Sequence, residues 1–243
     1  MIQKVITYQC SECHSLNLEK NGKDYKGSQK YHCRDCNHYG TLAAQPRAYP
    51  EFIKDLVIRA YRERASMRGI ERIFGIARQT LARWLKEKAA NLPDLSDTLE
   101  PPQADDVLEL DELWSFVLKK SDKRWLWIAL CRRTRQVVAY YIGDRSEKSC
   151  RELWQRIPEA YKKLNSYSDF WEAYQQVFTN GSHQSVGKES GETAHIERWN
   201  NTLRQRLARF VRKTLSFSKS DDFHEIVLKL YLFYYNTEWC PIS

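Results

Sequence analysis

One carboxylate stands at the centre of the stretch LELDELWSF, residues 108–116, whose apolar residues alternate as they do in a half-buried strand. Placing the carboxylate of Asp111 in a central strand costs free energy unless a positive partner compensates its charge, and divalent metal ions prefer carboxylate oxygens. We therefore predict that Asp111 is a metal ligand; the alternative is an exposed position on one face of the sheet. Its neighbours Glu109 and Glu112 are expected to tolerate substitution.

A second candidate ligand lies in the stretch ETAHIERWNNTLRQRLARFVRK, residues 192–213, whose apolar spacing predicts one continuous helix. Glu197, Asn201 and Arg204 follow one flank of this helix and are expected to face a cleft. The outer face is basic and suits contact with phosphates; an ordinary amphipathic helix with solvated arginines is the alternative. The apolar stripe consists of Ile196, Trp199, Leu203, Leu207 and Phe210, and the residues pointing elsewhere are Arg198, Gln205, Arg209 and Arg212.

Four cysteines near the N-terminus have the spacing of a structural zinc site. Two CxxC pairs, separated by 19 residues, supply four thiolates from two tight turns. Tetrahedral zinc would replace an apolar core that about 40 residues are too few to build. Unmetallated turns or a redox dithiol are the alternatives. The predicted ligands are Cys10, Cys13, Cys33 and Cys36, with turn signals at Asn21-Gly22 and Lys26-Gly27 between them and with His14, His32 and His38 at the surface.

From Pro50 the spacing of apolar residues becomes helical. Residues 50–65 predict one helix, a short second helix ends near Gly75, and a third helix begins near Ala77. This arrangement is typical of a helix-turn-helix, whose third helix enters the major groove of DNA. The alternative is a three-helix bundle with a solvated basic face. The residues predicted to face DNA are Arg78, Gln79, Thr80 and Arg83, and those predicted to face the core are Leu81, Trp84 and Leu85.

Three short apolar stretches, residues 108–116, 124–131 and 137–143, follow one another closely and predict an antiparallel meander. Ser146 then caps a predicted helix, and the last helix of the chain is expected to begin near Asp221. A meander followed by a helix, with an Asp at the centre of the first strand, is the opening of an RNase H-like fold. The sequence therefore predicts the opening of an RNase H-like domain, with Asp111 on a central strand.

The composition limits the class of protein. The 243 residues carry a net charge of +8, and the bases gather in two blocks on either side of an acidic, proline-containing stretch at residues 91–106, which we interpret as an extended linker. No apolar run approaches the roughly 18 residues of a membrane span, and we find no signal region. We expect a cytoplasmic protein with reduced thiols. Three further cysteines are interpreted as ordinary thiols: Cys131, Cys150 and Cys240.

Taken together, these patterns resemble the transposases of the insertion sequence 1 family, which are bacterial DDE recombinases. The resemblance rests on the strand LELDELW, on the paired cysteines and above all on the motif IERxNxxLRxRLxRxxRKxLSFSKS, which residues 196–220 satisfy. It implies that Asp111 is the first catalytic carboxylate and Glu197 the last. It also implies that Arg204 holds a terminal phosphate.

The second catalytic aspartate is predicted at Asp169, within SYSDFWEAY, residues 166–174. The family's usual pattern is D-G-x-x-x-Y at the end of an apolar strand. Tyr174 fits this pattern, whereas Phe170 stands where the pattern has glycine, and the preceding strand is short and polar. Asp144, at the end of the third strand of the meander, is the alternative.

The resemblance also implies an α+β, multidomain fold. A zinc ribbon is expected at residues 1–46, a helix-turn-helix at residues 47–92, a linker at residues 93–106 and an RNase H-like α/β catalytic domain at residues 107–243. The expected cofactors are one structural Zn²⁺ and two catalytic Mg²⁺ or Mn²⁺ ions, the latter bound by the three carboxylates Asp111, Asp169 and Glu197.

The implied activity is metal-dependent cleavage at the ends of an insertion sequence, followed by attack of the exposed 3′-OH on target DNA. The implied partners are double-stranded DNA, as terminal inverted repeats and as target, and further copies of the chain in a dimer or higher oligomer. The place of action would be the nucleoid in the bacterial cytoplasm. Two alternatives remain: a DNA-binding repressor with an inactive C-terminal domain, and an RNase H-like nuclease that cuts without joining.

Overall fold

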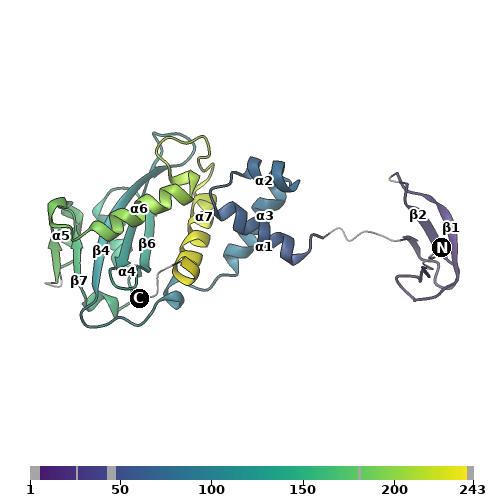
Figure 1. Ribbon diagram of the computed structural model, residues 1–243, viewed down its shortest axis with the longest axis horizontal. Coiled ribbons are helices and arrows are strands. Elements are labelled where there is room, and N and C mark those ends of the chain that lie inside the picture. The colour runs from purple at the N-terminus through teal and green to yellow at the C-terminus, as the bar shows by residue number, and fades with distance from the viewer. Residues whose placement is uncertain (1–5, 26, 43–47, 180–181, 240–243) are drawn as a thin grey trace, which may run out of the picture. The chain divides into compact units, whose positions relative to one another are not determined.

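A computed structural model describes residues 6–25, 27–42, 48–179 and 182–239 (Figure 1). The chain forms two compact units, Met1–Glu51 and Phe52–Ser243, each with a buried cluster of its own. Within the described ranges, no helix combines the length and the apolar character that a membrane span requires. Cys240, interpreted above as an ordinary thiol, lies outside the described residues.

The first unit is built on a small antiparallel sheet in the order β1-β2-β3. Its strands span Leu18–Lys23 (β1), Gln29–Cys33 (β2) and Tyr39–Thr41 (β3). In the described part of this unit, the fully buried apolar side chains are Cys10, Tyr31 and Cys33. A cluster of this size buries too little apolar surface to stabilise a folded unit, so another interaction must contribute.

Between β1 and β2 the backbone N–H of Gly27 donates to the carbonyl of Asp24 (3.0 Å), whereas Lys26, the other residue of the second turn signal, lies outside the described residues. The other prediction, a turn at Asn21-Gly22, is wrong, because both residues lie inside β1. The pairing of β1 with β2 shifts register there, and Gly22 has φ of +68°. Glycine adopts this conformation without strain, so it forms a bulge in the strand rather than a turn.

Three helices follow and have the positions that the sequence predicts. They span Glu51–Arg62 (α1), Met67–Phe74 (α2) and Arg78–Ala90 (α3). The hydroxyl of Ser66 accepts a hydrogen bond from the backbone N–H of Gly69 and caps α2, and Gly75 ends that helix with φ of +68°. The residues predicted to face the core are buried: Leu81, Trp84 and Leu85.

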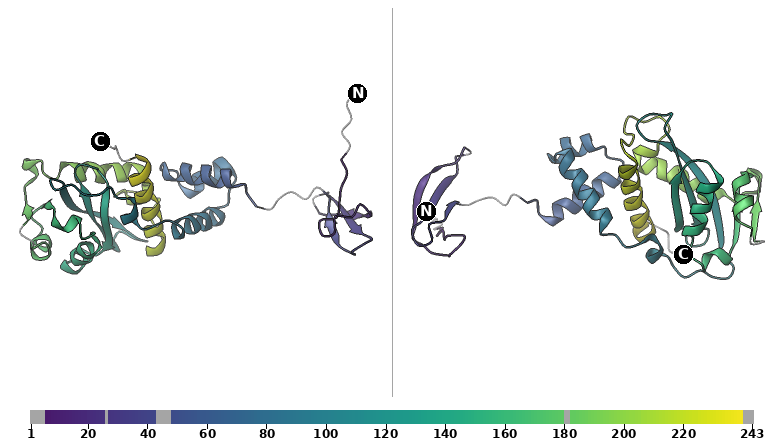
Figure 2. Two further views of the ribbon diagram at one scale, coloured as in Figure 1. Left: turned by 90° about the horizontal axis from the view of Figure 1, so that it is seen from below. Right: turned by 180° about the vertical axis from the view of Figure 1, so that it is seen from behind.

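These three helices share one apolar core with the C-terminal helix α7, Asp221–Tyr234. Ile70 and Leu81 belong to the same buried cluster as Leu228 and Leu232 of α7. Figure 2 shows α3 running beside α7, and the two helices contact each other directly. The helices α1, α2 and α3 are therefore packed on the rest of the second unit.

The segment that the sequence assigns to a linker is fixed on the edge of the large sheet. Leu95–Thr98 forms a 3-10 turn. The backbone N–H of Glu100 donates to Oε1 of Gln136 (2.9 Å), and Arg133 forms an ion pair with Asp106 (2.7 Å). The segment is thus held by polar contacts, and its role as a linker between domains stays a prediction.

Five strands form the sheet of the second unit in the order β6-β5-β4-β7-β8. They span Val107–Phe116 (β4), Lys123–Cys131 (β5), Val137–Gly143 (β6), Asn165–Ser168 (β7) and His183–Ser185 (β8). The antiparallel meander of β4, β5 and β6 is confirmed, whereas β7 runs parallel to β4 and β8 runs parallel to β7. The long strand β4 lies at the centre and carries Asp111 in its middle.

Helices cover both faces of this sheet (Figure 1). They span Glu147–Arg156 (α4), Glu172–Val177 (α5) and Ala194–Arg206 (α6), together with α7, which continues as a π-helix, Tyr235–Trp239. Leu110 of β4 packs under α4 and α5, and Leu113 packs under α6 and α7. Because successive strand residues point to opposite faces, Asp111 belongs to the α6 side and Glu112 to the α4 side.

Helix α6 is shorter than the sequence predicts. It ends at Arg206, Leu207 adopts φ of −110° and ψ of 101°, and a 3-10 turn follows at Ala208–Phe210. The physical reason is packing: the fully buried ring of Phe210 stacks on His224 with a centroid distance of 4.4 Å. A change of direction after Arg206 allows this contact, so the prediction of one continuous helix to residue 213 is wrong.

The buried imidazole of His224 predicts how stability depends on pH. It lies between the hydroxyls of Ser115 (3.0 Å) and Ser218 (2.8 Å), and burial lowers its pKa to about 4, with a further contribution from Arg209. In the unfolded chain the imidazole of His224 would have its ordinary pKa of about 6.5. The unfolded state therefore binds more protons, and the free energy of unfolding falls by up to about 3 kcal/mol as the pH falls from 6.5 to 4.

Urea unfolding at several pH values between 4 and 7 measures this effect. His183, whose pKa burial also lowers to about 4, adds to it in the same direction. His224→Gln should flatten the pH dependence of the unfolding free energy, whereas the exposed His14 should be replaceable by Gln without changing that slope. Equal slopes for wild type and His224→Gln would contradict the assignment.

Candidate active site and metal centres

Three carboxylates gather where β7 leaves the sheet. Asp111, Glu112 and Asp169 each offer an oxygen that lies within 4.8 Å of the others. β7 pairs with β4 only as far as Glu109 and ends at Ser168, so the chain departs beside the middle of β4. Asp169 follows directly and reaches Asp111. Oxygen donors in this arrangement are suited to a hard divalent cation.

Asp111 stands in a strongly anionic setting on the α6 side of the sheet. One of its oxygens accepts a hydrogen bond from Nδ2 of Asn200 (2.6 Å), and the other accepts from the backbone N–H of Glu112 (2.8 Å). Burial raises the pKa of Asp111 to about 7, and the charges of Glu112, Asp169 and Glu197 contribute to the rise. A bound cation would relieve this repulsion and displace the proton.

Glu112 is buried on the opposite side of β4, contrary to the expectation of a tolerant position. Its carboxylate accepts hydrogen bonds from Nε of Arg145 (2.8 Å) and from the hydroxyl of Tyr174 (3.0 Å). Burial and the charge of Asp169 raise its pKa, and the two donors oppose that rise. Removing one member of such a buried network leaves the others without a partner, so a change at Glu112 is expected to be costly.

The guanidinium that holds Glu112 is itself fixed by aromatic rings. The central carbon of Arg145 lies 4.7 Å from the ring centroid of Trp125 and 4.1 Å from that of Trp171. Trp171 in turn donates its backbone N–H to Asp169 (3.0 Å). Stacking and hydrogen bonding thus connect Glu112 to Asp169 through one arginine.

Glu109 is fully buried and docks the start of α6 on β4, again contrary to the expectation of tolerance. Its carboxylate accepts the backbone N–H groups of His195 and Ile196, both at 3.0 Å. It also binds Nδ1 of His195 (2.7 Å) and Nε of Arg132 (2.8 Å). A negative charge at the N-terminal turn of a helix is favourable, because that end exposes unpaired N–H groups.

Glu197 lies in the first turn of the helix that Glu109 docks, with an exposed side chain. Among the described residues, the compact carboxylate group does not include it. Its charge nevertheless contributes to the raised pKa of Asp111. Arg204 faces the same region: burial lowers the pKa of its guanidinium, repulsion from Arg212 acts in the same direction, and Asp111 opposes both.

Asp144, the alternative second aspartate, has a different role. It accepts hydrogen bonds from the hydroxyls of Ser146 and Ser149 at the start of α4, and these bonds lower its pKa. Within the described ranges, the group around Asp111 contains Asp169 and not Asp144. The structure therefore associates Asp144 with the N-terminus of α4.

The four predicted zinc ligands converge in the first unit. The Sγ atoms of Cys10 and Cys36 lie 3.6 Å apart, as do those of Cys13 and Cys33, and all four lie within 4.8 Å of one another. The backbone N–H of Cys13 makes the largest contribution to lowering the pKa of Cys10 to about 6, whereas the neighbouring thiols raise the pKa of Cys13 and raise that of Cys36 to about 12. These cysteines are arranged so that they could bind a structural metal ion.

The residues predicted to contact DNA occupy different environments. Arg78, Gln79 and Arg83 of α3 are exposed, with Thr80 half-buried beside them. Arg78 forms an ion pair with Glu71 (3.1 Å). The exposed side chains on and beyond α6 include Arg198 and Arg212.

Arg209 does not lie on the outer face of a helix. Its Nε donates to the hydroxyl of Tyr61 (3.0 Å), and its guanidinium lies 4.9 Å from the ring centroid of Phe223. It thus connects α1 with α7 inside the second unit, and its availability to DNA is limited by these contacts.

Sequence reasoning missed three residues of the candidate site: Glu112, Arg145 and Asn200. Glu112 follows Asp111 in a strand buried on both faces, so an acid there required a partner of its own. Asn200 was overlooked in favour of Asn201, which is exposed. Neighbouring residues of a helix point about 100° apart. At the edge of the apolar stripe, the sequence alone did not decide whether Asn200 or Asn201 faces the site.

Comparison with known proteins agrees with this geometry. The profile of the family described as IS1 transposase matches residues 106–236. The insertion element iso-IS1n protein InsB of Shigella dysenteriae is 40% identical over 127 residues, which are 52% of this chain and 93% of that protein. The IS1 protein InsB of Shigella flexneri is 39% identical over 124 residues, which are 51% of this chain and 92% of that protein. The chain belongs to the IS1 transposase family.

Proposed function

We propose that this chain binds the ends of an insertion sequence, cleaves them with the help of two metal ions and joins the exposed 3′-OH to target DNA. The observation that carries the proposal is the meeting of Asp111 with Asp169, beside a helix that brings Glu197 close enough to affect the pKa of Asp111. Membership of a transposase family supports a role for this acidic site in cutting and joining DNA.

The fold of the catalytic part is proposed to be RNase H-like. The sheet order β6-β5-β4-β7-β8, with an antiparallel meander and two parallel strands, supports this assignment. Helices on both faces support it as well. We assign the zinc ribbon to residues 1–46, the helix-turn-helix to residues 47–92, the linker to residues 93–106 and the catalytic domain to residues 107–243.

The residues present fit two Mg²⁺ or Mn²⁺ ions, because the carboxylates of Asp111, Asp169 and Glu197 are oxygen donors whose mutual repulsion a cation would relieve. When bound, such ions activate a water or a 3′-hydroxyl and stabilise the leaving oxygen. The protein's own groups orient these ligands. Asn200 fixes the carboxylate of Asp111, and Glu109 fixes the helix that carries Glu197.

DNA would be located by the N-terminal parts and held near the site by arginines. The exposed face of α3, with Arg78, Gln79, Thr80 and Arg83, is assigned to base and backbone contacts in the major groove. Arg204 is assigned to a terminal phosphate, and Arg198 and Arg212 to the duplex backbone. Arg209 is assigned an indirect part in DNA binding, because it connects α1 with α7 and so holds these helices together. Pairing of two element ends requires at least a dimer.

The first prediction from this proposal concerns the carboxylates. Asp111→Asn keeps the size of the side chain but removes the charge that a cation needs, so DNA binding should persist while strand cleavage falls by about 10³-fold or more. Asp169→Asn and Glu197→Gln should behave alike. The measurement is nicking of a labelled duplex that carries the element's end, in Mg²⁺ and in Mn²⁺.

Asp105→Asn is the matched control, because Asp105 is exposed on the segment before β4; its cleavage rate should equal that of wild type. The double variant Asp111→Asn/Glu197→Gln should be little slower than either single variant, since the carboxylates act as one site. Cleavage near the normal rate by Asp111→Asn would refute the assignment. Cleavage without joining to a second duplex would favour a nuclease.

The second prediction concerns the four cysteines. We propose that they bind one Zn²⁺, because the first unit has too small an apolar cluster to fold without it. Chelation should release one Zn²⁺ per chain and abolish binding to the element's end. Cys10→Ser should do the same, whereas Cys150→Ala, in the second unit, should retain the metal. Unchanged zinc content in Cys10→Ser would show that the site is assigned wrongly.

A further inference from the structure

One leucine of the second unit is almost fully exposed and lies in a stretch rich in bases. Leu215 is 99% exposed, and Arg212, Lys213 and Lys219 lie within four residues of it. It lies in residues 211–220, which follow the 3-10 turn after α6. Beside this segment run residues 117–123, which are the turn after β4 and the first residue of β5. We call these two segments the basic lobe; its bases are Lys119, Lys120, Lys123, Arg212, Lys213 and Lys219.

The two segments of the basic lobe are joined at their base. The backbone N–H of Leu118 donates to the carbonyl of Ser218 (2.8 Å), next to a parallel bridge between Val117 and Ser218. Ser218 is fully buried, and its hydroxyl binds Nδ1 of His224 (2.8 Å). In Figure 1 the teal turn and the yellow-green segment lie side by side at the top of the second unit.

An aromatic contact also holds the segment on the C-terminal side of Leu215, one residue before Ser218. The ring of Phe217 packs on Phe116 at the end of β4, with a centroid distance of 5.7 Å. The guanidinium of Arg209 donates to the carbonyl of Phe217 (3.4 Å). Leu215 therefore projects from a base that is held by packing and hydrogen bonds, which is the condition for a preorganised contact.

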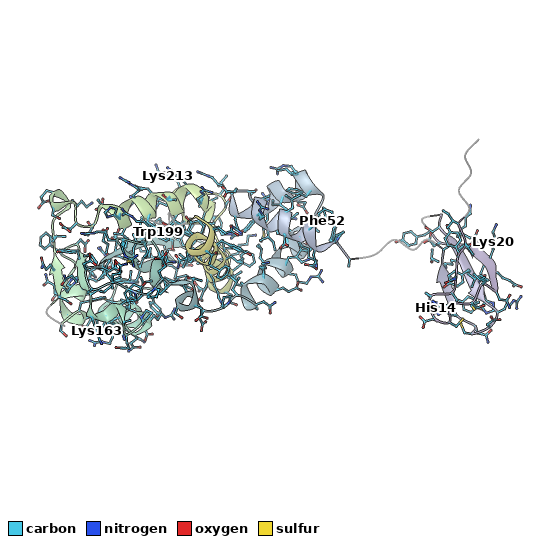
Figure 3. The ribbon with its side chains drawn as sticks, turned by 60° about the horizontal axis from the view of Figure 1, so that its bottom comes forward. His14, Lys20, Phe52, Lys163, Trp199 and Lys213 are labelled. Carbon is cyan, nitrogen blue, oxygen red and sulfur yellow. The ribbon has the colours of Figure 1, made fainter. Side chains whose placement is uncertain are left out.

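The charge of the basic lobe is largely uncompensated within the chain. Its six bases face one acid, Asp122. In the part of the chain that the structure describes, none of the six bases forms an ion pair. Figure 3 shows Lys213 at the outer edge, whereas Trp199 of α6 lies within the body of the unit. An exposed apolar residue in a segment rich in unpaired bases is a feature of proteins that insert a wedge between base pairs and hold the flanking phosphates.

We propose that the basic lobe binds duplex DNA and that Leu215 inserts between two base pairs as a wedge. This inference rests on the proposed function, since the wedge would distort the duplex that the proposed catalytic site receives. Phe116, which ends β4 at the base of the lobe, lies five residues beyond Asp111. At about 3.3 Å per residue this end of the strand stands about 17 Å from Asp111, a length of about five base pairs at about 3.4 Å each. The wedge therefore acts several base pairs from the cleaved phosphate.

The test uses 2-aminopurine, whose fluorescence rises when it unstacks. It replaces one adenine at a time in a 30-base-pair duplex from the element's end, and binding is followed in Ca²⁺ with the Asp111→Asn chain so that no strand is cut. We expect a several-fold rise at one position, lost in Leu215→Ala and retained in Leu215→Met. Leu16→Ala, at an exposed leucine of the first unit, should leave the rise unchanged.

Salt dependence separates the wedge from the cations. Lys119→Gln/Lys120→Gln/Lys213→Gln should weaken binding to any duplex and lower the salt slope by roughly one unit per lost phosphate contact, whereas Leu215→Ala should leave that slope unchanged. The wedge proposal is wrong if the duplex binds without any fluorescence rise, or if the rise persists in Leu215→Ala. Either result would count against it even if the chain cleaves DNA. If Leu215→Ala loses affinity for phosphatidylserine vesicles but still unstacks DNA, Leu215 contacts a membrane and the wedge proposal is wrong. Absence of both DNA binding and cleavage would overturn the proposed function itself.

Discussion

The arrangement of the second unit depends on one buried carboxylate, that of Glu109. With no exposed surface, it must find partners within the protein, and it finds them in the first turn of α6 and in Arg132. A buried charge without such partners would destabilise the fold, so the helix has to dock at this point on β4. Two residues further along the same face stands Asp111. The contact that stabilises the fold therefore also sets the distance between the strand and the helix that carry the acidic site.

The same strand carries two further acids that point to opposite faces. Glu112 is neutralised by Arg145, which two tryptophan rings hold, whereas Asp111 receives only neutral hydrogen-bond donors. Repulsion in the cluster thus concentrates on Asp111, whose pKa rises to about 7. Because of this asymmetry, a bound cation would stabilise the charged form of Asp111 more than that of Glu112. Glu112 and Arg145, on the other side of β4, are held in place by contacts within the protein and do not need a metal ion or DNA to order them.

Local patterns predicted much of the fold. Alternating apolar residues placed β4, short apolar runs placed β5 and β6, Ser146 placed the start of α4, and Gly75 placed the turn before α3, because each signal acts over a few residues. What depended on distant contacts could not be predicted. The end of α6 is decided by the stacking of Phe210 on His224, and the burial of Glu112 depends on an arginine 33 residues away. Helical spacing placed Glu197 on a flank expected to face a cleft, whereas the choice of Asp169 came from resemblance, since its spacing alone does not place it beside Asp111.

The affinity of the purified chain for Mn²⁺, measured by titration calorimetry, tests most directly whether Glu109 sets the geometry of the site. Glu109→Gln removes no proposed metal ligand, yet it should weaken Mn²⁺ binding by about tenfold or more, as expected when a group that orients ligands is lost. Glu192→Gln is the matched control, because Glu192 shares Arg132 but does not hold the backbone of α6; its affinity should equal that of wild type. Circular dichroism would establish that both variants are folded. Wild-type affinity in folded Glu109→Gln would contradict the account.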